Sequence, residues 1–201
     1  MTIDMNISAD WDEDQEWERE WWGNCVNTMD EELKQVTYAR CMQMYPQVGM
    51  WRWPVFDLGG KKILDIGGGP TSLLLKCVNR ASGCLVADPC DYPEWVTHRY
   101  AAADITQVKI AGEDIDFTGF DEVWIYNVLQ HVDDPKKIVE NAKKAAPVVR
   151  IFEWVDIPPH KGHPHELKAL LLNEWLGGFG TVEQLSEGGC QGKAFYGVFG
   201  L

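Results

Sequence analysis

The sequence of 201 residues lacks the features of a membrane protein and of a secreted, disulfide-stabilised protein. It contains no apolar run of the ~18 residues that a membrane-spanning helix needs, and its acidic N-terminus lacks the basic and apolar regions of a signal peptide. Its six cysteines form no C-x-x-C pair, which indicates reduced thiols rather than disulfides or a zinc site. We therefore expect a cytoplasmic protein with no membrane contact and no bound metal.

Positive charge is scarce, because 18 Lys and Arg residues stand against 31 Asp and Glu residues, for a net charge of −13. An acidic chain without a basic stripe repels phosphodiester backbones, so we expect no nucleic-acid partner. The first 20 residues hold eight of the acids and only one Arg. We predict that residues 1–14 form a flexible acidic tail and that residues 15–201 form one domain, which is large enough to fold without disulfides or metal.

The most informative segment of the chain is residues 61–76, KKILDIGGGPTSLLLK. A short apolar strand ends near Asp65, and the chain passes through Gly67, Gly68 and Gly69 into a helical run. Such a sharp turn requires backbone conformations that glycine adopts most readily, and a ligand can approach glycine backbone without meeting a Cβ. The segment therefore predicts a nucleotide-binding loop.

Two residues indicate which nucleotide this loop binds. In the dinucleotide fingerprint G-x-G-x-x-G, the third glycine is replaced here by Ser72. The carboxylate of Asp65, just before the glycines, would also oppose a pyrophosphate at a helix N-terminus. The same carboxylate favours a ligand with ammonium and sulfonium groups, such as S-adenosylmethionine.

Two further segments end where a parallel sheet would bind such a ligand. Residues 83–89, GCLVADP, predict a second strand that closes with Asp88, whose carboxylate can accept hydrogen bonds from both ribose hydroxyls. Residues 120–135, FDEVWIYNVLQHVDDP, predict a buried strand followed by a polar break at Asn127. Both segments are therefore expected to line one edge of the sheet, together with the glycine loop.

These motifs resemble those of class I S-adenosylmethionine-dependent methyltransferases. Asp65, Gly67 and Gly69 match the D-x-G-x-G pattern of that family. Asp88 matches the acid that closes the second strand, and residues 120–135 match the F-D-x-V…L-x-H-V-x-D-P segment. The flanking sequences WWGNC, GHPH and GCQGKAFYG further resemble a narrower set of short methyltransferase-domain proteins met in bacteriophages and environmental sequences.

The resemblance implies a Rossmann-like fold, which is a doubly wound, mostly parallel α/β sheet with an antiparallel last strand and N-terminal helices. It also implies S-adenosylmethionine as the cofactor. The acid that often contacts adenine in the family is Ala111 here, so Glu113 or Asp114 is expected to substitute for it. The expected cofactor-binding residues are Trp22, Asn24, Asp65, Gly67, Gly68, Gly69, Asp88, Glu113, Asp114, Asn127 and Val128.

The predicted secondary structure alternates between strands and helices, which favours a parallel doubly wound sheet. Apolar runs predict strands at 62–66, 84–88, 107–111, 121–127 and 147–154. Periodicity and start signals predict helices at 15–25, 29–44, 71–80, 93–100, 135–145 and 165–175. Thr28 and Glu31 are expected to form a capping box before the second helix. GTVEQL and KAFYGVF predict a C-terminal hairpin around SEGGCQG.

The N-terminal tryptophans admit two interpretations. Trp17 and Trp21 are four residues apart and can form a helix face that packs on the sheet. Alternatively, Trp21 or Trp22 forms part of a lid whose aromatic face lies against a sulfonium, with Asn24 bonding the methionine end of the ligand.

The histidine-rich segment at 153–168, EWVDIPPHKGHPHELK, follows the predicted fifth strand, at the edge where ligands of open sheets bind. Its imidazoles and carboxylates suit zinc or iron, but H-x-x-H-x-H in a loop is not a common metal-site spacing. His163 can instead precede a helix that has Pro164 in its first turn, or a histidine of this loop can contact the substrate. His131, after the fourth strand, is open to the same choice between packing and proton transfer.

The sequence predicts an S-adenosylmethionine-dependent methyltransferase that acts on a small-molecule acceptor by direct displacement. The alternatives are a non-catalytic S-adenosylmethionine-binding domain and, less favoured by Asp65 and Ser72, a nicotinamide-dependent oxidoreductase. The oligomeric state is left open. The expected catalytic residues are His131, His163 and His165, and the expected substrate-binding residues are Trp21, Glu153, His160 and Tyr196.

Overall fold

The computed structural model describes residue 16, residues 20–47 and residues 54–200. The predicted tail at 1–14 and Trp17 lie outside the described residues. Of the first predicted helix, residues 15 and 17–19 also lie outside them, residues 16 and 20–22 are helical, and residues 23–25 are not helical. Within the described ranges, no helix combines the length and apolar character needed to cross a lipid bilayer.

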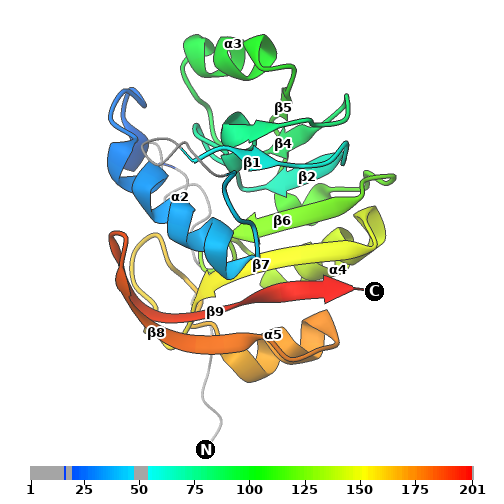
Figure 1. Ribbon diagram of the computed structural model, residues 1–201. Coiled ribbons are helices and arrows are strands. Elements are labelled where there is room, and N and C mark those ends of the chain that lie inside the picture. Colours follow the sequence, from blue (N-terminus) through cyan, green and yellow to red (C-terminus); the bar gives the residue numbers. More distant parts are fainter. Residues whose placement is uncertain (1–15, 17–19, 48–53, 201) are drawn as a thin grey trace, which may run out of the picture.

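Seven strands form the central sheet, namely β2 (Ile63–Ile66), β4 (Leu85–Ala87), β5 (Thr106–Val108), β6 (Glu122–Tyr126), β7 (Val148–Trp154), β8 (Thr181–Glu187) and β9 (Cys190–Gly200). Their order across the sheet is β5-β4-β2-β6-β7-β9-β8 (Figure 1). The strands from β5 to β7 in this order pair in parallel, whereas β9 runs antiparallel to both of its neighbours. The predicted mostly parallel sheet with an antiparallel last strand is confirmed.

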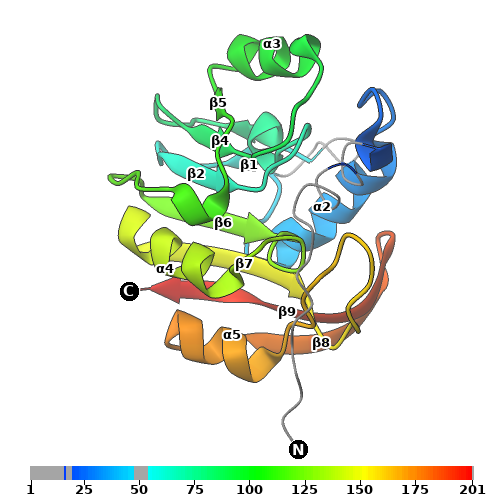
Figure 2. The ribbon, with the colours of Figure 1, turned by 180° about the vertical axis from the view of Figure 1, so that it is seen from behind.

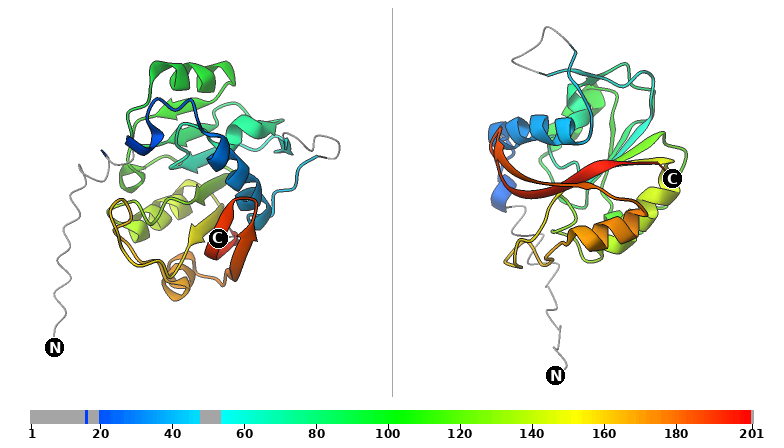
Figure 3. Two further views of the ribbon diagram at one scale, coloured as in Figure 1. Left: turned by 90° about the vertical axis from the view of Figure 1, so that its left-hand side faces the viewer. Right: turned by 60° about the horizontal axis from the view of Figure 1, so that its bottom comes forward.

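Helices cover both faces of the sheet (Figures 1 and 2). α2 (Met29–Cys41) and α3 (Glu94–Ala102) contribute buried residues to one apolar cluster, and α4 (Pro135–Ala145) and α5 (Ala169–Leu176) contribute to a second one. Figure 3 shows α2 on one side of β8 and β9 and α5 on the other side. The architecture is therefore doubly wound, as predicted.

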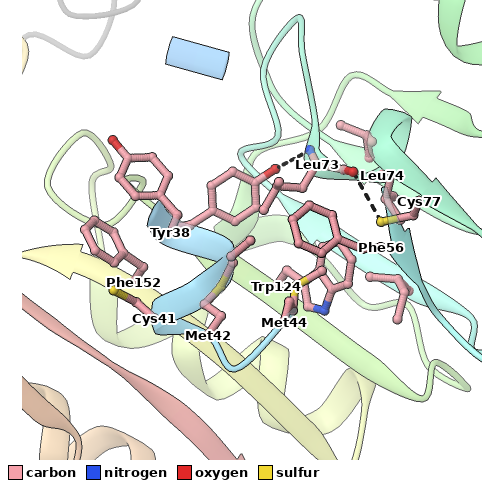
Figure 4. Close-up of a cluster of buried hydrophobic side chains, with 14 of the residues drawn as sticks. Tyr38, Cys41, Met42, Met44, Phe56, Leu73, Leu74, Cys77, Trp124 and Phe152 are labelled. Carbon is pink, nitrogen blue, oxygen red and sulfur yellow. Dashed lines mark hydrogen bonds between the residues drawn. The ribbon is translucent and has the colours of Figure 1, made fainter. Parts of the chain in front are cut away.

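The central strand β6 is buried along its whole length, and its side chains alternate between the two clusters. Trp124 and Tyr126 point into the cluster beneath α2, and Val123 and Ile125 point into the cluster beneath α4. Figure 4 shows Tyr38 of α2 beside Phe152 of β7, and their ring centroids lie 4.2 Å apart. Burial of side chains of this size contributes about 1.5–3 kcal/mol each, which holds α2 against the sheet.

The structure confirms the predicted N-terminus of α4 but not the capping box predicted before α2. α4 begins as predicted, because the side chain of Asp134 accepts a hydrogen bond from the backbone N–H of Lys137 at 3.0 Å and Pro135 occupies the first turn. The capping box predicted before α2 is wrong, because Thr28 Oγ1 donates to Glu32, 2.7 Å away, and makes no capping hydrogen bond to the backbone.

The predicted helix at 71–80 is wrong. Leu73–Lys76 form a single 3₁₀ turn (η1), and β3 (Cys77–Val78) then pairs in parallel with β1 (Phe56–Asp57). This apolar run has no intrinsic preference strong enough to resist strand pairing, so the tertiary context decides its conformation. α5 starts at Ala169 instead of 165, because the preceding residues belong to the histidine-rich loop.

β8 and β9 form the predicted C-terminal hairpin with longer strands than predicted. The pairing of Glu187 with Cys190 leaves only Gly188 and Gly189 in the turn. Both glycines have a positive φ, 58° and 76°, which a type I′ turn requires and which costs glycine no steric strain.

The carboxylate of Glu122, at the start of β6, joins three parts of the chain. It accepts hydrogen bonds from Lys61 at 2.6 Å, from Arg150 at 2.6 and 3.1 Å, and from the indole N–H of Trp124 at 3.1 Å. Burial alone would raise the pKa of this carboxyl, but the hydrogen bonds from Arg150 and Lys61 outweigh burial and lower the pKa to about 2.

The stability of the fold is expected to fall in acid because of Glu122. Its folded-state pKa of about 2 lies below the ordinary value of 4.5, so the ionised carboxylate stabilises the fold above pH 4.5 and this contribution is lost as the pH falls towards 2. We expect Glu122→Gln to lower the free energy of unfolding at neutral pH by ~3 kcal/mol and to flatten its acid dependence, measured by urea unfolding.

Glu140→Gln is the matched control, because Glu140 forms only an exposed pair with Lys136, and it should change the free energy of unfolding by ~0.5 kcal/mol or less. An acid dependence in Glu122→Gln as steep as in the parent protein would show that another group controls it.

Candidate functional site

A cavity of about 540 Å³ lies over the carboxyl ends of the parallel strands β2, β4, β6 and β7. Its lining comes from the loops after these strands, from residues 21–22, from α2 and from the tip of the β8–β9 hairpin. A cavity of this volume accommodates small molecules. It occupies the edge at which open α/β sheets bind their ligands.

The backbone of Gly67, Gly68 and Gly69, after β2, forms part of the cavity wall. Gly67 has a φ of 69°, and a Cβ at this position would lie 2.5 Å from Val128 Cγ2. Gly69 has a φ of 62°, and a Cβ there would lie 3.7 Å from the ring of Trp22. The loop is therefore packed against the β6 loop on one side and offers bare backbone beneath Trp22 on the other.

Asp65 lies directly beneath the glycine loop and is not part of the cavity lining. Its fully buried carboxylate accepts hydrogen bonds from the hydroxyls of Ser72 and of Tyr126, the latter at 2.6 Å. Burial raises the pKa of this carboxyl to about 7, and the hydrogen bonds from Ser72 and Tyr126 oppose that shift. The carboxylate holds the loop in place, and its contact with a ligand stays a prediction.

Asp88, the first residue after β4, binds the glycine loop from the other side. One carboxylate oxygen accepts a hydrogen bond from the backbone N–H of Gly69 at 3.0 Å. The other accepts from the N–H of Cys90 at 3.0 Å and from the hydroxyl of Tyr92 at 2.9 Å. The hydroxyl of Tyr100 donates to the carbonyl of Gly69 at 2.8 Å, which fixes the far end of the loop.

The loop after β6 is positioned by a second buried carboxylate. Glu153 of β7 accepts hydrogen bonds from the backbone N–H of Val128 at 3.0 and 3.2 Å and from that of Leu129 at 3.1 Å. Burial raises the pKa of Glu153 to about 7, and these backbone hydrogen bonds oppose the shift. Asn127, which lines the cavity, has a φ of 58°, a conformation that non-glycine residues adopt mainly at constrained or functional positions. Glu153 was predicted to bind substrate, but it is not among the residues that line the cavity.

Three of the predicted histidines lie together on the cavity wall formed by the β6 and β7 loops. The ring centroid of His163 lies 4.3 Å from that of His131 and 4.1 Å from that of His160. Burial, and then the neighbouring His131 and His160, lower the pKa of His163 to about 3. His165 lies outside the lining, with its Nε2 2.6 Å from the carbonyl oxygen of Val132. In the described part of the chain, no group of three or more His, Cys, Asp or Glu residues is arranged to hold a metal ion.

Trp21 and Trp22 line the cavity from the N-terminal side. Trp22 is half-buried and packs against the apolar cluster beneath α2, whereas Trp21 is 65% exposed. The packed helix face was predicted for Trp17 and Trp21, but Trp17 lies outside the described residues and Trp21 is largely exposed, so the tryptophan that packs is Trp22. Tyr38 of α2 is fully buried and also lines the cavity, and Figure 4 shows its hydroxyl pointing away from Met42.

Four further predicted residues lie outside the lining. Asn24 is exposed and accepts a hydrogen bond from a backbone N–H two residues later. Glu113 accepts from the backbone of the turn before α4, and Asp114 is exposed. The hydroxyl of Tyr196 donates to Glu183 on the neighbouring strand. Their predicted roles would require these side chains to move.

The cavity also contains residues that the sequence did not single out. They are Glu31, Lys34, Gln35, Tyr38, Thr71, Pro89, Cys90, Tyr92, Tyr126, Gln130, Val132, Trp154, Ile157, Gly189 and Gln191. The helical spacing could have grouped the cavity residues on α2, because Glu31, Lys34 and Tyr38 are three and four residues apart and share one face of the predicted helix. Trp154 and Gln191 approach the cavity only because β7 and β9 pair, which no local pattern reveals.

No protein-family model matches the sequence, and no curated protein matches it. Two solved structures resemble the chain along most of its length. Magnesium protoporphyrin IX methyltransferase from Synechocystis PCC 6803, with bound S-adenosylmethionine, has a TM-score of 0.59 at 12% identity, over 94% of this chain and 97% of that chain. A second structure, 1,6-didemethyltoxoflavin-N1-methyltransferase from Burkholderia thailandensis with bound 1,6-didemethyltoxoflavin and S-adenosylhomocysteine, has a TM-score of 0.62 at 12% identity, over 92% and 86%. This chain has the class I methyltransferase fold.

Alanine at Gly67 tests how tightly the glycine loop of this methyltransferase fold is packed. The new Cβ would lie 2.5 Å from Val128 at a φ of 69°, so we expect Gly67→Ala to lower the free energy of unfolding by ~2–3 kcal/mol, measured by urea unfolding. Gly59→Ala is the matched control, because Gly59 has a φ of 58° with nothing within 4 Å of the added Cβ. It should lose only the ~1 kcal/mol of backbone strain. Equal losses in the two variants would show that Gly67 is not packed against Val128.

Proposed function

We propose that this protein is an S-adenosylmethionine-dependent methyltransferase that transfers a methyl group to a small-molecule acceptor by direct displacement. The observation that carries the proposal is that one cavity is lined by the backbone of the glycine loop, by Asp88 and by a cluster of histidines. The two similar structures support it, since one contains S-adenosylmethionine and the other contains S-adenosylhomocysteine with a small-molecule substrate.

The residues around the glycine loop fit this cofactor. Gly69 presents its backbone to the cavity between Trp22 and Tyr92 without a side chain of its own, and its φ of 62° favours glycine. Asp88 offers a carboxylate at the cavity wall, and carboxylates suit the paired hydroxyls of a ribose. The aromatic faces of Trp22 and Tyr92 suit an adenine ring or a sulfonium.

The strand order supports separate cofactor and acceptor ends. Neighbouring strands lie ~4.8 Å apart, so the loops after β4 and β7, which are three strands apart, are separated by roughly 14 Å. We assign the cofactor to the β4, β2 and β6 loops and the acceptor to the β6 and β7 loops, α2 and the hairpin tip. This second part of the cavity includes Tyr38, Trp154 and Ile157, whose apolar surfaces suit a compact, partly aromatic acceptor and help to exclude water.

Bound S-adenosylmethionine would supply a methyl group that is already activated, so the protein needs to orient the acceptor and exclude water rather than provide a nucleophile. The ring of His131 lines the cavity and is suited to orienting an acceptor. Its Nδ1 lies 2.7 Å from the carbonyl oxygen of Gly162 and therefore carries the proton, so Nε2 is an acceptor, and the side-chain N–H of Gln130 lies 3.4 Å from it.

Neither alternative is favoured. A nicotinamide dinucleotide needs an α-helix N-terminus for its pyrophosphate, but the residues after the glycine loop form the four-residue η1. A purely accessory binding domain has no need for a histidine cluster in the same cavity as the glycine loop.

Cofactor binding is tested first by thermal unfolding. We expect S-adenosylmethionine and S-adenosylhomocysteine to raise Tm, because a ligand at 100 times its Kd stabilises the native state by ~2.7 kcal/mol. NADH serves as the control and should leave Tm unchanged. Stabilisation by NADH alone would overturn the proposal.

Asp88→Ala is expected to weaken the affinity for S-adenosylhomocysteine by ~1–3 kcal/mol in calorimetry, because charged hydrogen bonds to the ribose are lost. Tyr92→Phe is the matched control, since it removes one donor to Asp88 but keeps the carboxylate, and its effect should be smaller. An unchanged affinity in Asp88→Ala would place the ribose elsewhere.

A further inference from the structure

His163 and His160 form a directly hydrogen-bonded pair of imidazoles on the acceptor side of the cavity. The backbone sets their geometry, because the two residues exchange backbone hydrogen bonds of 3.0 and 2.8 Å. Gly162 has a φ of 79° in the turn between them, which glycine adopts without strain. The turn therefore presents both rings in a fixed relation.

The hydrogen bonds assign the tautomers of the two neutral rings. His160 Nδ1 lies 3.0 Å from the carbonyl oxygen of Lys161, which can only accept, so this nitrogen carries the proton. His160 Nε2 is then an acceptor, and the hydrogen bond between the rings must be donated by His163 Nδ1. The lone pair of His163 is consequently on Nε2.

The two rings differ in their access to water. His163 is half-buried, and burial together with the facing rings of His131 and His160 keeps its pKa near 3. His160 is exposed, so water can solvate a charge on its ring. A proton that reaches His163 is therefore driven towards His160.

We propose that His163 and His160 form a proton relay that carries the acceptor's proton from the cavity to solvent. The inference rests on the proposed methyl transfer and restricts the acceptor to molecules that bear a proton on the attacking oxygen or nitrogen. The acceptor atom forms its bond to the methyl carbon while the carbon–sulfur bond breaks, with the electron pair left on sulfur. The acceptor's proton moves to His163 Nε2, the Nδ1 proton of His163 moves to His160 Nε2, and the imidazolium of His160 releases its Nδ1 proton to water. Both rings then carry the proton on Nε2, and they return to the starting tautomers by proton exchange with water after the product leaves.

The tautomers can be measured without a known acceptor. Long-range ¹H–¹⁵N correlations of the full chain at neutral pH, with and without S-adenosylhomocysteine, report which imidazole nitrogen is protonated. We expect a protonated Nδ1 and an unprotonated Nε2 on both His160 and His163. A protonated Nε2 on neutral His163 would overturn the relay.

His160→Gln tests whether the proton travels along the pair. The glutamine oxygen can still accept the hydrogen bond from His163 but cannot carry the proton onward. We expect exchange of the His163 Nδ1 proton with water to slow by ~10-fold or more, while the His163 tautomer stays the same. Because His160 is exposed, the variant is expected to fold.

His98→Gln is the control, because His98 is an exposed histidine on α3, outside the cavity, and should leave the exchange rate unchanged. Unchanged exchange in His160→Gln would refute the relay. Calorimetry on the same samples separates the two claims, since failure to bind S-adenosylhomocysteine would refute the proposed function, whereas intact binding with unchanged exchange refutes only the relay.

Discussion

The carboxylate of Asp65, fully buried beneath the glycine loop, is the group on which the geometry of the site depends. Removing a carboxylate from water is costly, and the hydroxyls of Ser72 and Tyr126 offset part of that cost. Tyr126 closes β6 and Ser72 precedes η1, so one carboxylate ties β2 to both. A Cβ on Gly68 would lie 2.7 Å from Asp65, and only glycine lets the loop pass so close.

Glu153 repeats this arrangement one loop further along the sheet. Both carboxylates are fully buried, burial raises both pKa values to about 7, and each accepts hydrogen bonds that position a strand-end loop. Asp88 adds a third anchor at the surface of the cavity, where it binds Gly69. The cavity wall is thus positioned mainly from inside the sheet, which leaves the outer surfaces of the loops available to a ligand.

The parts of the fold that depend on local patterns could be predicted from the sequence. The start of α4 follows from Asp134 and the proline after it, and Asp88 was identified because it closes a recognisable strand. Residues 71–80 were mispredicted because their apolar side chains fit a helix and a buried strand equally well, and pairing with β1 decided between them. The anchoring role of Glu153 and the place of Tyr38 in the cavity depend on which elements become neighbours, so no local pattern could reveal them.

We propose that the cavity at the carboxyl edge of the sheet binds S-adenosylmethionine. A crystal structure of the full chain grown with saturating S-adenosylhomocysteine tests it most directly. We expect a ligand that lies along Gly67, Gly68 and Gly69, with its ribose hydroxyls bonded to Asp88 and its sulfur directed towards the side of His131. A ligand bound at any other place, with this cavity left vacant, would show that this cavity is not the cofactor site.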